Sequence, residues 1–540
     1  MRRDLARLAN ETFDALVIGG GVTGACIARD ASLRGLSVAL VEKKDFANAT
    51  SAHNSKLIHG GLRYLRNFEI GLVRESLRER RNWQRIAPHL VQPLSFLIPL
   101  YNAGFKARTT LSVGLNLYDA LSFDRGWLDD PAERLPGHRW LDKKRALAEE
   151  PMLDGAGFEG SFRYYDAQMY APERLALECI LDAAEHGAAA ANYLTAESFL
   201  LREGRIEGAK LRDLFDGSTF DVRAKLTILA AGPWADLFLN SALGKPTTHK
   251  LLRSKGIHLL VPAITRSDAL TVAAGSGHFF VLPWRGLSLL GTTDTAFHGD
   301  PDSVHATQSD IAEFIAFIAK YLPEAKLTRD KVRFAYAGLR PLVDEGTGNT
   351  YDASRRAELV DHKSDGVDGL LSAIGGKWTT SRALAETVVD AAVAKLATKA
   401  AACSTATTRL PGGHIERRNE FFADQKKTYP RIATDHLARL YGSRLSDVVA
   451  NQTANLLSAI ASTGDVGAQV LFAIREESAL TLDDVVMRRT GIGQLGDPGN
   501  ATLEAVAALM AAELGWSDEY KNEQIGFVAQ NYRIVQDRAA

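Results

Sequence analysis

The sequence has few cysteines, no excess of charge of either sign and no long uninterrupted apolar run. Its three cysteines among 540 residues, Cys26, Cys179 and Cys403, lie far apart and lack the spacing of metal ligands. We therefore expect a reducing compartment and no metal site. Lys plus Arg (64) nearly balance Asp plus Glu (65), so no overall field would gather nucleic acid, and any anion site must be local. Nucleic acid is not an expected partner.

No stretch reaches the roughly 18 uncharged apolar residues of a membrane-spanning helix, so none is expected. The first residues, MRRDLARLANETF, contain basic side chains but no apolar run, which predicts neither a signal peptide nor an anchor. Attachment to a membrane face stays open. The segment from Val91 to Phe123 is strongly apolar, with only Lys106, Arg108 and Asp119 as charges. It is either a buried core helix with a strand or a membrane-facing amphipathic segment with basic headgroup contacts.

The order of patterns along the chain predicts a mixed α/β region followed by a helical one. Strand-like runs alternate with helical periods through about the first 395 residues. Residues 397–414 are small, Thr-rich and punctuated by Gly and Pro, which is typical of a linker. Beyond them only helical patterns occur: Leu503, Val506, Met510 and Leu514 form one apolar face that Gly515 should terminate.

The first strand pattern leads into a phosphate-binding turn. Residues 13–18 (FDALVI) form a short buried-strand pattern that runs into Gly19, Gly21 and Gly24 of a G-x-G-x-x-G motif and then into a helical stretch. The first glycine permits the tight turn, the second lets a pyrophosphate approach the backbone, and the third lets helix and sheet close together. The amino terminus of that helix then faces the anion.

A second strand, residues 37–41, ends in Glu42, whose carboxylate should accept the ribose hydroxyls of a dinucleotide. An acidic residue there disfavours a 2′-phosphate, so NADP is not expected. Later glycine-rich turns follow apolar strands at residues 228–234, 336–341 and 373–380. None repeats G-x-G-x-x-G before a helix, so no second dinucleotide site for NAD is predicted.

Longer motifs resemble the FAD-dependent glycerol-3-phosphate dehydrogenase family. They are VIGGGVTGACIARDASLRGLSVALVEKKDFANATSAHNSKLIHGGLRYL, LAAGPWAD, SKGIHL, PWRGLSLLGTTD, AGLRPL and IGGKWTTSRALAE, in the family's order over most of residues 13–390. TLDDVVMRRTGIG, near the end of the chain, is similar to a recurrent motif of the family's helical cap.

The resemblance implies an FAD-binding Rossmann-type domain of the glutathione-reductase-like kind, an inserted β-rich substrate domain and a C-terminal helical domain. The predicted ranges are 1–90, 160–250 and 340–396 for the FAD-binding domain, 91–159 and 251–339 for the substrate domain, 397–414 for the linker and 415–540 for the cap. The implied activity is oxidation of sn-glycerol 3-phosphate to dihydroxyacetone phosphate with electrons passed to quinone. The implied location is cytoplasmic, peripherally on the inner face of the membrane, and a homodimer is left open.

The resemblance also assigns site residues. His59 is the expected base that takes the hydroxyl proton, with His258 in reserve; Lys377 is expected at the junction of flavin and substrate, and Arg340 beside the reacting atoms. Guanidinium groups suit a phosphate dianion because their planar fork donates two parallel hydrogen bonds. The expected substrate-binding residues are Arg63, Tyr64, Lys255, His258, Arg340 and Arg355. The expected cofactor-binding residues are Gly19, Gly21, Gly24, Glu42, Thr50, Ser51, Lys56, Leu57, Gly60, Gly61, Gly232, Gly338, Gly376, Lys377, Trp378 and Thr379.

Two departures from the family pattern bear on the substrate. His53 and Asn54 stand where the family more often has Ser, Ala or Arg. Ala171, Pro172 and Glu173 stand near a place where members of the family carry an acidic residue before Ser or Ala and Arg. They leave open a four-carbon polyol phosphate such as erythritol phosphate. Two further alternatives are an oxidase that passes electrons to oxygen and a flavin-bearing assembly or sensor protein without chemistry.

Overall fold

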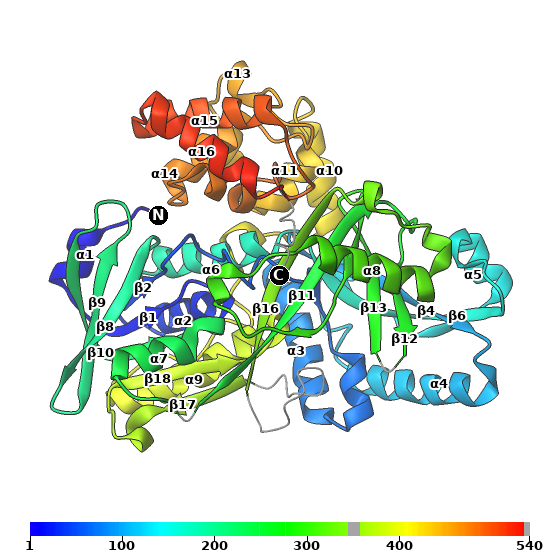
Figure 1. The fold of residues 1–540 in the computed structure, drawn as a ribbon, viewed down its shortest axis with the longest axis horizontal. Coiled ribbons are helices and arrows are strands. Elements are labelled where there is room, and N and C mark those ends of the chain that lie inside the picture. Colours follow the sequence, from blue (N-terminus) through cyan, green and yellow to red (C-terminus); the bar gives the residue numbers. More distant parts are fainter. Residues whose placement is uncertain (248, 276, 344–356, 534–540) are drawn as a thin grey trace.

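The computed structural model describes residues 1–540 except 248, 276, 344–356 and 534–540. Figure 1 shows two sheets side by side, with the C-terminal helices gathered at one end. This arrangement confirms the expected fold class, an α/β nucleotide-binding unit joined to a β-rich unit and a helical domain. Among the described residues, no helix combines the length and the apolar content needed to cross a membrane.

The first sheet is a doubly wound sheet with the order β17-β18-β10-β1-β2-β7, extended by β8 and β9. Its central strand β1 pairs in parallel with β10 on one side and with β2 on the other. All four residues of β2 are buried, as expected for a strand covered on both faces. The strands are β1 (Thr12–Ile18), β2 (Val38–Val41), β7 (Ala189–Ala191), β8 (Leu194–Arg202), β9 (Arg205–Asp213), β10 (Thr219–Leu229), β17 (Ala357–Asp361) and β18 (Leu370–Gly375).

Helices α2, α6 and α9 pack in the core on one face of this sheet, and on the other face α1 and α7 pack in a core shared with β8 and β9. Helix α2 is buried along nearly its whole length, because small residues such as Ala25 and Ala28 allow close packing on the sheet and against α6 and α9. The helices of this region are α1 (Leu5–Asn10), α2 (Val22–Leu33), α3 (Ile70–Ile86), α6 (Pro172–Glu185), α7 (Ala235–Leu243) and α9 (Ser381–Leu396).

The second sheet is mainly antiparallel, in the order β15-β11-β14-β13-β12-β4-β6-β3, with β16 paired to β11 and β5 to β6. Its strands are β3 (Leu57–Ile58), β4 (Val91–Tyr101), β5 (Arg139–Asp142), β6 (Phe158–Met169), β11 (Leu251–Pro262), β12 (Ala269–Ala274), β13 (Gly277–Trp284), β14 (Leu287–Gly291), β15 (Thr295–Ala296) and β16 (Phe334–Val343). Helices α4 (Gly104–Leu121), α5 (Lys143–Glu149) and α8 (Gln308–Tyr321) lie around it. The expected domain limits at 159/160 and 339/340 fall inside β6 and β16, so sheet membership favours assigning both whole strands to the substrate domain.

The apolar segment from Val91 to Phe123 divides into two unlike parts. Strand β4 is largely buried, whereas α4 buries only Leu115 and Tyr118. The side chains of Phe105 and Val113 are 85% and 64% exposed. The buried strand that was expected in this segment is therefore present as β4. The helix is not a core helix: α4 lies on the surface with apolar side chains facing outward.

The C-terminal region is helical, as its periodicity indicates. It contains α10 (Arg418–Thr428), α11 (Thr434–Tyr441), α12 (Leu445–Val449), α13 (Ala454–Leu457), α14 (Gly467–Glu476), a π-helical turn at Asp484–Arg489, α15 (Asn500–Leu514) and α16 (Asp518–Gln530). Helix α15 ends at Gly515 in the left-handed conformation, with Leu503, Val506 and Met510 fully buried. The predicted helix face and its stop are thus confirmed.

Candidate active site

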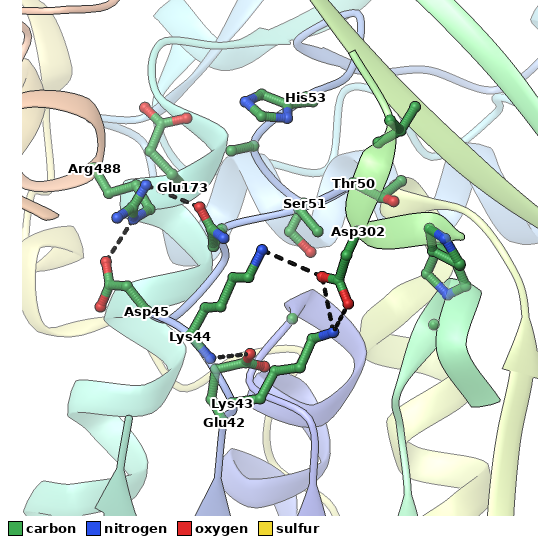
Figure 2. Close-up of a pocket in the computed structure, with 18 of the residues that line it drawn as sticks. Glu42, Lys43, Lys44, Asp45, Thr50, Ser51, His53, Glu173, Asp302 and Arg488 are labelled. Atoms are coloured by element: carbon green, nitrogen blue, oxygen red, sulfur yellow. Dashed lines mark hydrogen bonds and ion pairs between the residues drawn. The ribbon is translucent and has the colours of Figure 1, made fainter. Parts of the chain in front are cut away.

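A cavity of about 1250 Å³ lies where the two sheets and the C-terminal helices meet. Its walls come from the turn after β1, the end of β2, residues 48–53, the turn after β18, strand β16 and the C-terminal helices. We call it the large cavity. Figure 2 shows carboxylates and cations around it, with Glu42 near one end and His53 near the other. A cavity of this length and mixed lining suits an extended dinucleotide.

The glycine turn forms one wall of the large cavity as the motif predicts. Gly19 has φ +114°, a conformation that side chains disfavour, and a β-carbon there would meet the backbone of Ala230 on neighbouring β10. A β-carbon at Gly24 would overlap the carbonyl oxygen of Gly19. Helix α2 begins after Gly21, and Gly21, Val22 and Thr23 line the cavity, so the positive end of the helix dipole lies at its wall.

Glu42 stands at the end of β2 on the cavity wall. Its Oε2 accepts from the amide of Gly20 (2.7 Å) and its Oε1 from the amide of Lys44 (2.9 Å). Burial raises the pKa of this carboxyl, and the two amides oppose the increase. The carboxylate is thereby held beside the glycine turn, where the ribose of a dinucleotide would lie.

Two further carboxylates beside this wall are paired with cations, and neither was predicted. Asp302, from the second sheet's long loop, accepts from Lys43 (2.7 Å) and lies 3.2 Å from Lys44. Asp45 accepts from Arg488 and Arg489 of the π-helical turn. The ion pairs of Asp302 and of Asp45 each join segments that are distant in sequence, so no local pattern predicts them. The one signal in the sequence is the pair of adjacent arginines in TLDDVVMRRTGIG.

The segment after the second strand crosses the cavity. Ser51 Oγ accepts from the amide of Val22 at the start of α2 (2.8 Å), and Thr50 donates to the carbonyl of Leu339 (2.6 Å). Lys56 is buried, donates to the carbonyl of Ala52 and lies 3.7 Å from Glu173. Residues 50–56 thus connect the phosphate-binding turn to strand β16.

The turn after β18 places Lys377 in the large cavity. Gly375 and Gly376 both have positive φ, and the Trp378 indole donates to the carbonyl of Ser51 (3.1 Å). Lys377 Nζ is buried and has no hydrogen-bond partner among the described residues. Burial lowers the pKa of this ammonium. An unpartnered buried cation indicates that an anionic or strongly polar ligand completes this site.

His59 lies next to the same turn but outside the lining of the large cavity. Its amide donates to Thr379 Oγ1 (3.2 Å), and the Thr379 hydroxyl is 3.3 Å from its carbonyl. Burial lowers the pKa of His59 to about 3, aided by the charges of Lys377 and Arg63. Tyr64 lies under the Lys377 ammonium, 4.6 Å from Nζ to the ring centre. His59, Arg63, Tyr64 and Lys377 are therefore brought together.

Arg340 belongs to a second group, which lines a small cavity and not the large one. Its guanidinium donates to Ser254 Oγ (3.0 Å) and Thr292 Oγ1 (2.7 Å), which fixes its direction. A small cavity of about 80 Å³ adjoins it, lined by Thr50, His53, Asn54, Ser55, Gly256, His258, Gly338 and Arg340. His258 Nε2 is 2.9 Å from Ser55 Oγ, and burial lowers the pKa of this histidine well below its usual value.

Some of the remaining predicted site residues line the large cavity and others do not. Lys255 pairs with Asp310 (2.8 Å) and lines neither cavity, so the geometry does not favour its assignment to the substrate. Arg355 lies outside the described residues. The predicted cofactor residues that line the large cavity are Gly19, Gly21, Glu42, Thr50, Ser51, Lys56, Gly232, Gly376, Lys377 and Trp378. Those that do not line it are Gly24, Leu57, Gly60, Gly61, Gly338 and Thr379, of which Gly338 lines the small cavity.

Two of the residues that depart from the family pattern, His53 and Glu173, line the large cavity. His53 stacks on Tyr336 with ring centres 5.5 Å apart and lines both cavities. Glu173 contacts Lys56 and accepts from Gln494 of the C-terminal region. These two side chains form part of the cavity wall at the end away from Glu42.

Comparison with known proteins finds FAD-dependent oxidoreductases and glycerol-3-phosphate dehydrogenases similar to nearly the whole chain. Residues 14–391 match the family described as "FAD dependent oxidoreductase", and residues 403–521 match "C-terminal domain of alpha-glycerophosphate oxidase". The chain is 37% identical to "Glycerol-3-phosphate dehydrogenase" of Synechocystis, over 97% of both chains. It is 33% identical to the mitochondrial "Glycerol-3-phosphate dehydrogenase" of Bos taurus, over 95% of this chain and 72% of the relative.

Among solved structures, the glycerol-3-phosphate dehydrogenase from Bacillus halodurans, complexed with FAD, is similar with a TM-score of 0.78. The sequence identity is 28%, and the alignment covers 99% of this chain and 98% of that one. The similarity therefore extends over both sheets and the C-terminal helices.

Proposed function

The chain belongs to the FAD-dependent glycerol-3-phosphate dehydrogenase family, and from this premise we propose that it oxidises sn-glycerol 3-phosphate to dihydroxyacetone phosphate. When bound, FAD supplies the hydride acceptor at its N5 atom for the hydrogen on C2 of the substrate. The described residues fit FAD: the glycine turn would hold its pyrophosphate, Glu42 would accept hydrogen bonds from a ribose, and both line the same large cavity as Lys377.

The observation that carries the proposal is the buried ammonium of Lys377, which has no hydrogen-bond partner among the described residues. It is buried in a cavity formed by a dinucleotide-binding turn and lies beside His59, Arg63 and Tyr64. A cation in this position stabilises negative charge on a reduced ring system or on the substrate oxygen. The cluster of His59, Arg63, Tyr64 and Lys377 favours an enzyme over a flavin-binding protein that catalyses no reaction.

His59 takes the hydroxyl proton of the substrate in this proposal. A general base must be unprotonated before it can act, and the pKa of His59 is lowered to about 3 by burial and then by Lys377 and Arg63. The imidazole is consequently neutral at physiological pH in the unliganded protein. A phosphate dianion held nearby would raise that pKa toward neutrality and improve its strength as a base.

The phosphate of the substrate is assigned to arginines, of which Arg340 is the best oriented. Its guanidinium is fixed by Ser254 and Thr292, so little side-chain entropy is lost on binding. Arg340→Ala should raise the KM for glycerol 3-phosphate by roughly ten- to hundredfold, because a hydrogen bond to a charged group contributes about 1.5–3 kcal/mol. Lys255→Ala is the matched control, since it removes a nearby cation that lines neither cavity. Equal KM values for the two variants, or loss of FAD in the arginine variant, would contradict the assignment.

We further propose that electrons pass to quinone and that the enzyme rests peripherally on the inner face of the cytoplasmic membrane. Support comes from α4, where Phe105, Val113 and Leu117 are exposed beside the basic side chains of Lys106 and Arg108. Apolar and basic groups on one surface helix are typical of binding to anionic lipid. Figure 1 shows α4 at the end opposite the C-terminal helices.

The experiment that tests the activity is reduction of the flavin without oxygen. Purified protein should show a flavin spectrum that glycerol 3-phosphate bleaches, and added quinone analogue should restore it. Erythritol phosphate is compared because His53 and Glu173 alter the cavity wall, and oxygen is compared as acceptor. A spectrum that glycerol 3-phosphate leaves unchanged would refute the proposed substrate, and bleaching by erythritol phosphate alone would reassign it.

A further inference from the structure

Asp166, on strand β6, contacts the turn that carries His59. We propose that Asp166 is a positioning residue for the His59–Gly61 turn and that the hydroxyl of Tyr118, on α4, holds Asp166 in place. The proposal rests on the proposed function, because it treats His59 as the base of that reaction. Neither Asp166 nor Tyr118 lines the large or the small cavity, so in this proposal each acts through the backbone of the turn.

The contacts of Asp166 converge on one carboxylate. The amide of Gly60 donates to Asp166 Oδ1 (3.2 Å), and Arg80 of α3 donates to the same oxygen. The Tyr118 hydroxyl is 2.9 Å from both carboxylate oxygens. The carboxylate therefore joins α3, α4 and the His59 turn at one point.

Burial makes this arrangement rigid. Asp166 and Arg80 are 2% and 1% exposed, so their ion pair is shielded from water. Burial raises the pKa of Asp166, whereas Arg80 and the donated hydrogen bonds oppose that increase. A buried carboxylate that loses one donor is left with an uncompensated acceptor, so its position would change.

The turn is confined from two sides. A β-carbon at Gly60 would overlap the Tyr118 hydroxyl and Leu77, so the backbone passes directly against α3 and α4. On the other side, Thr379 contacts both the amide and the carbonyl of His59. These contacts hold the backbone from which the His59 side chain extends, and of them the Asp166 hydrogen bond is the one that depends on α4.

The chain offers a matched pair of tyrosines for the test. Tyr118 and Tyr164 are both buried, and their rings are 6.2 Å apart in the same cluster. Of the two tyrosines, Tyr118 donates to Asp166, whereas the Tyr164 hydroxyl is 3.3 Å from Thr271 Oγ1. Tyr118→Phe and Tyr164→Phe each delete one buried hydroxyl and leave the ring, so general packing effects should be alike.

We expect Tyr118→Phe to slow anaerobic flavin reduction at saturating glycerol 3-phosphate by about tenfold or more, because small misplacements of a reacting group are costly. The substrate dissociation constant, the FAD content and the visible spectrum should match those of Tyr164→Phe. Hydrogen exchange in the peptide that contains Gly60 should be faster in Tyr118→Phe alone. Asp166→Asn, which also leaves Arg80 without its counter-charge, should show both effects more strongly.

Equal reduction rates and equal exchange in the two tyrosine variants would overturn the inference while leaving the proposed function intact. A change only in substrate affinity or FAD content would overturn it as well, because a positioning role predicts a change in rate at saturation. If glycerol 3-phosphate fails to reduce the wild-type flavin, the proposed function falls first and the inference falls with it.

Discussion

Replacement of Asp45 by Asn should destabilise the protein far more than replacement of Asp302 by Asn. Each carboxylate pairs with two cations beside the same cavity. The Asp45 side chain is fully buried, as is Arg489, whereas the Asp302 side chain is 41% exposed. The two variants therefore test how burial changes the contribution of similar ion pairs.

The magnitude follows from the partners that remain. Arg488 keeps Asp483 and Asp484 as neighbours, but the described carboxylate paired with Arg489 is Asp45. Removing one partner of a buried pair costs about 3–5 kcal/mol, while an exposed pair contributes about 0–1 kcal/mol. The pKa of Asp45 is lowered to about 2, because Arg489 and Arg488 outweigh the effect of burial. The carboxylate therefore stabilises the fold above about pH 4, and this contribution is lost as the pH falls through about 2.

The assay is unfolding at pH 7 in urea, followed by the flavin fluorescence that appears when FAD is released, at low and at high salt. Asp45→Asn should lower the free energy of unfolding by about 3–5 kcal/mol at both salt concentrations. Asp302→Asn should lower it by less than about 1 kcal/mol, and high salt should remove the difference from wild type. Equal losses in the two variants, or a loss in Asp45→Asn that salt abolishes, would refute the reasoning.

Two further predictions concern pH and lipid. Burial lowers the pKa of His53 to about 3, aided by Lys56, so stability should fall as the pH drops from about 6.5 toward 3, where the unfolded chain binds the proton more readily. His53→Gln should make the melting temperature fall less steeply over this range than it does in a variant of the exposed His298; parallel curves would contradict the assignment. Phe105→Ser should weaken sedimentation with anionic vesicles. Leu214→Ser, which removes an exposed apolar side chain on the first sheet, should not; equal binding by both variants would argue against α4 as the lipid-facing surface.

Much of the nucleotide-binding region could be predicted because its determinants are local. The spacing of Gly19, Gly21 and Gly24 after a buried strand specifies a turn that only small residues can form. The position of Glu42 could be predicted as well, because this residue directly follows the next strand. The C-terminal helix ended at Gly515 for a similarly local reason, since glycine adopts the left-handed conformation at low cost.

Predictions that depended on which way a side chain faces were less complete. The apolar composition of Val91–Phe123 suited a core helix as well as a surface one, and packing left Phe105 and Val113 outside. Lys255 and His258 are close in sequence, yet they lie on opposite faces of β11 because side chains alternate along a strand. Lys255 consequently pairs with Asp310 instead of lining a cavity.

The sequence by itself determined the dinucleotide turn, the α/β class and the helical end of the chain, because each follows from the spacing of neighbouring residues. Only the tertiary structure decided which charges meet. Asp45 and Arg489 are 444 positions apart, and Asp166 meets the amide of Gly60 across 106 positions. No local pattern records such contacts, since they form only when burial brings separate elements together and leaves each buried charge in need of a partner.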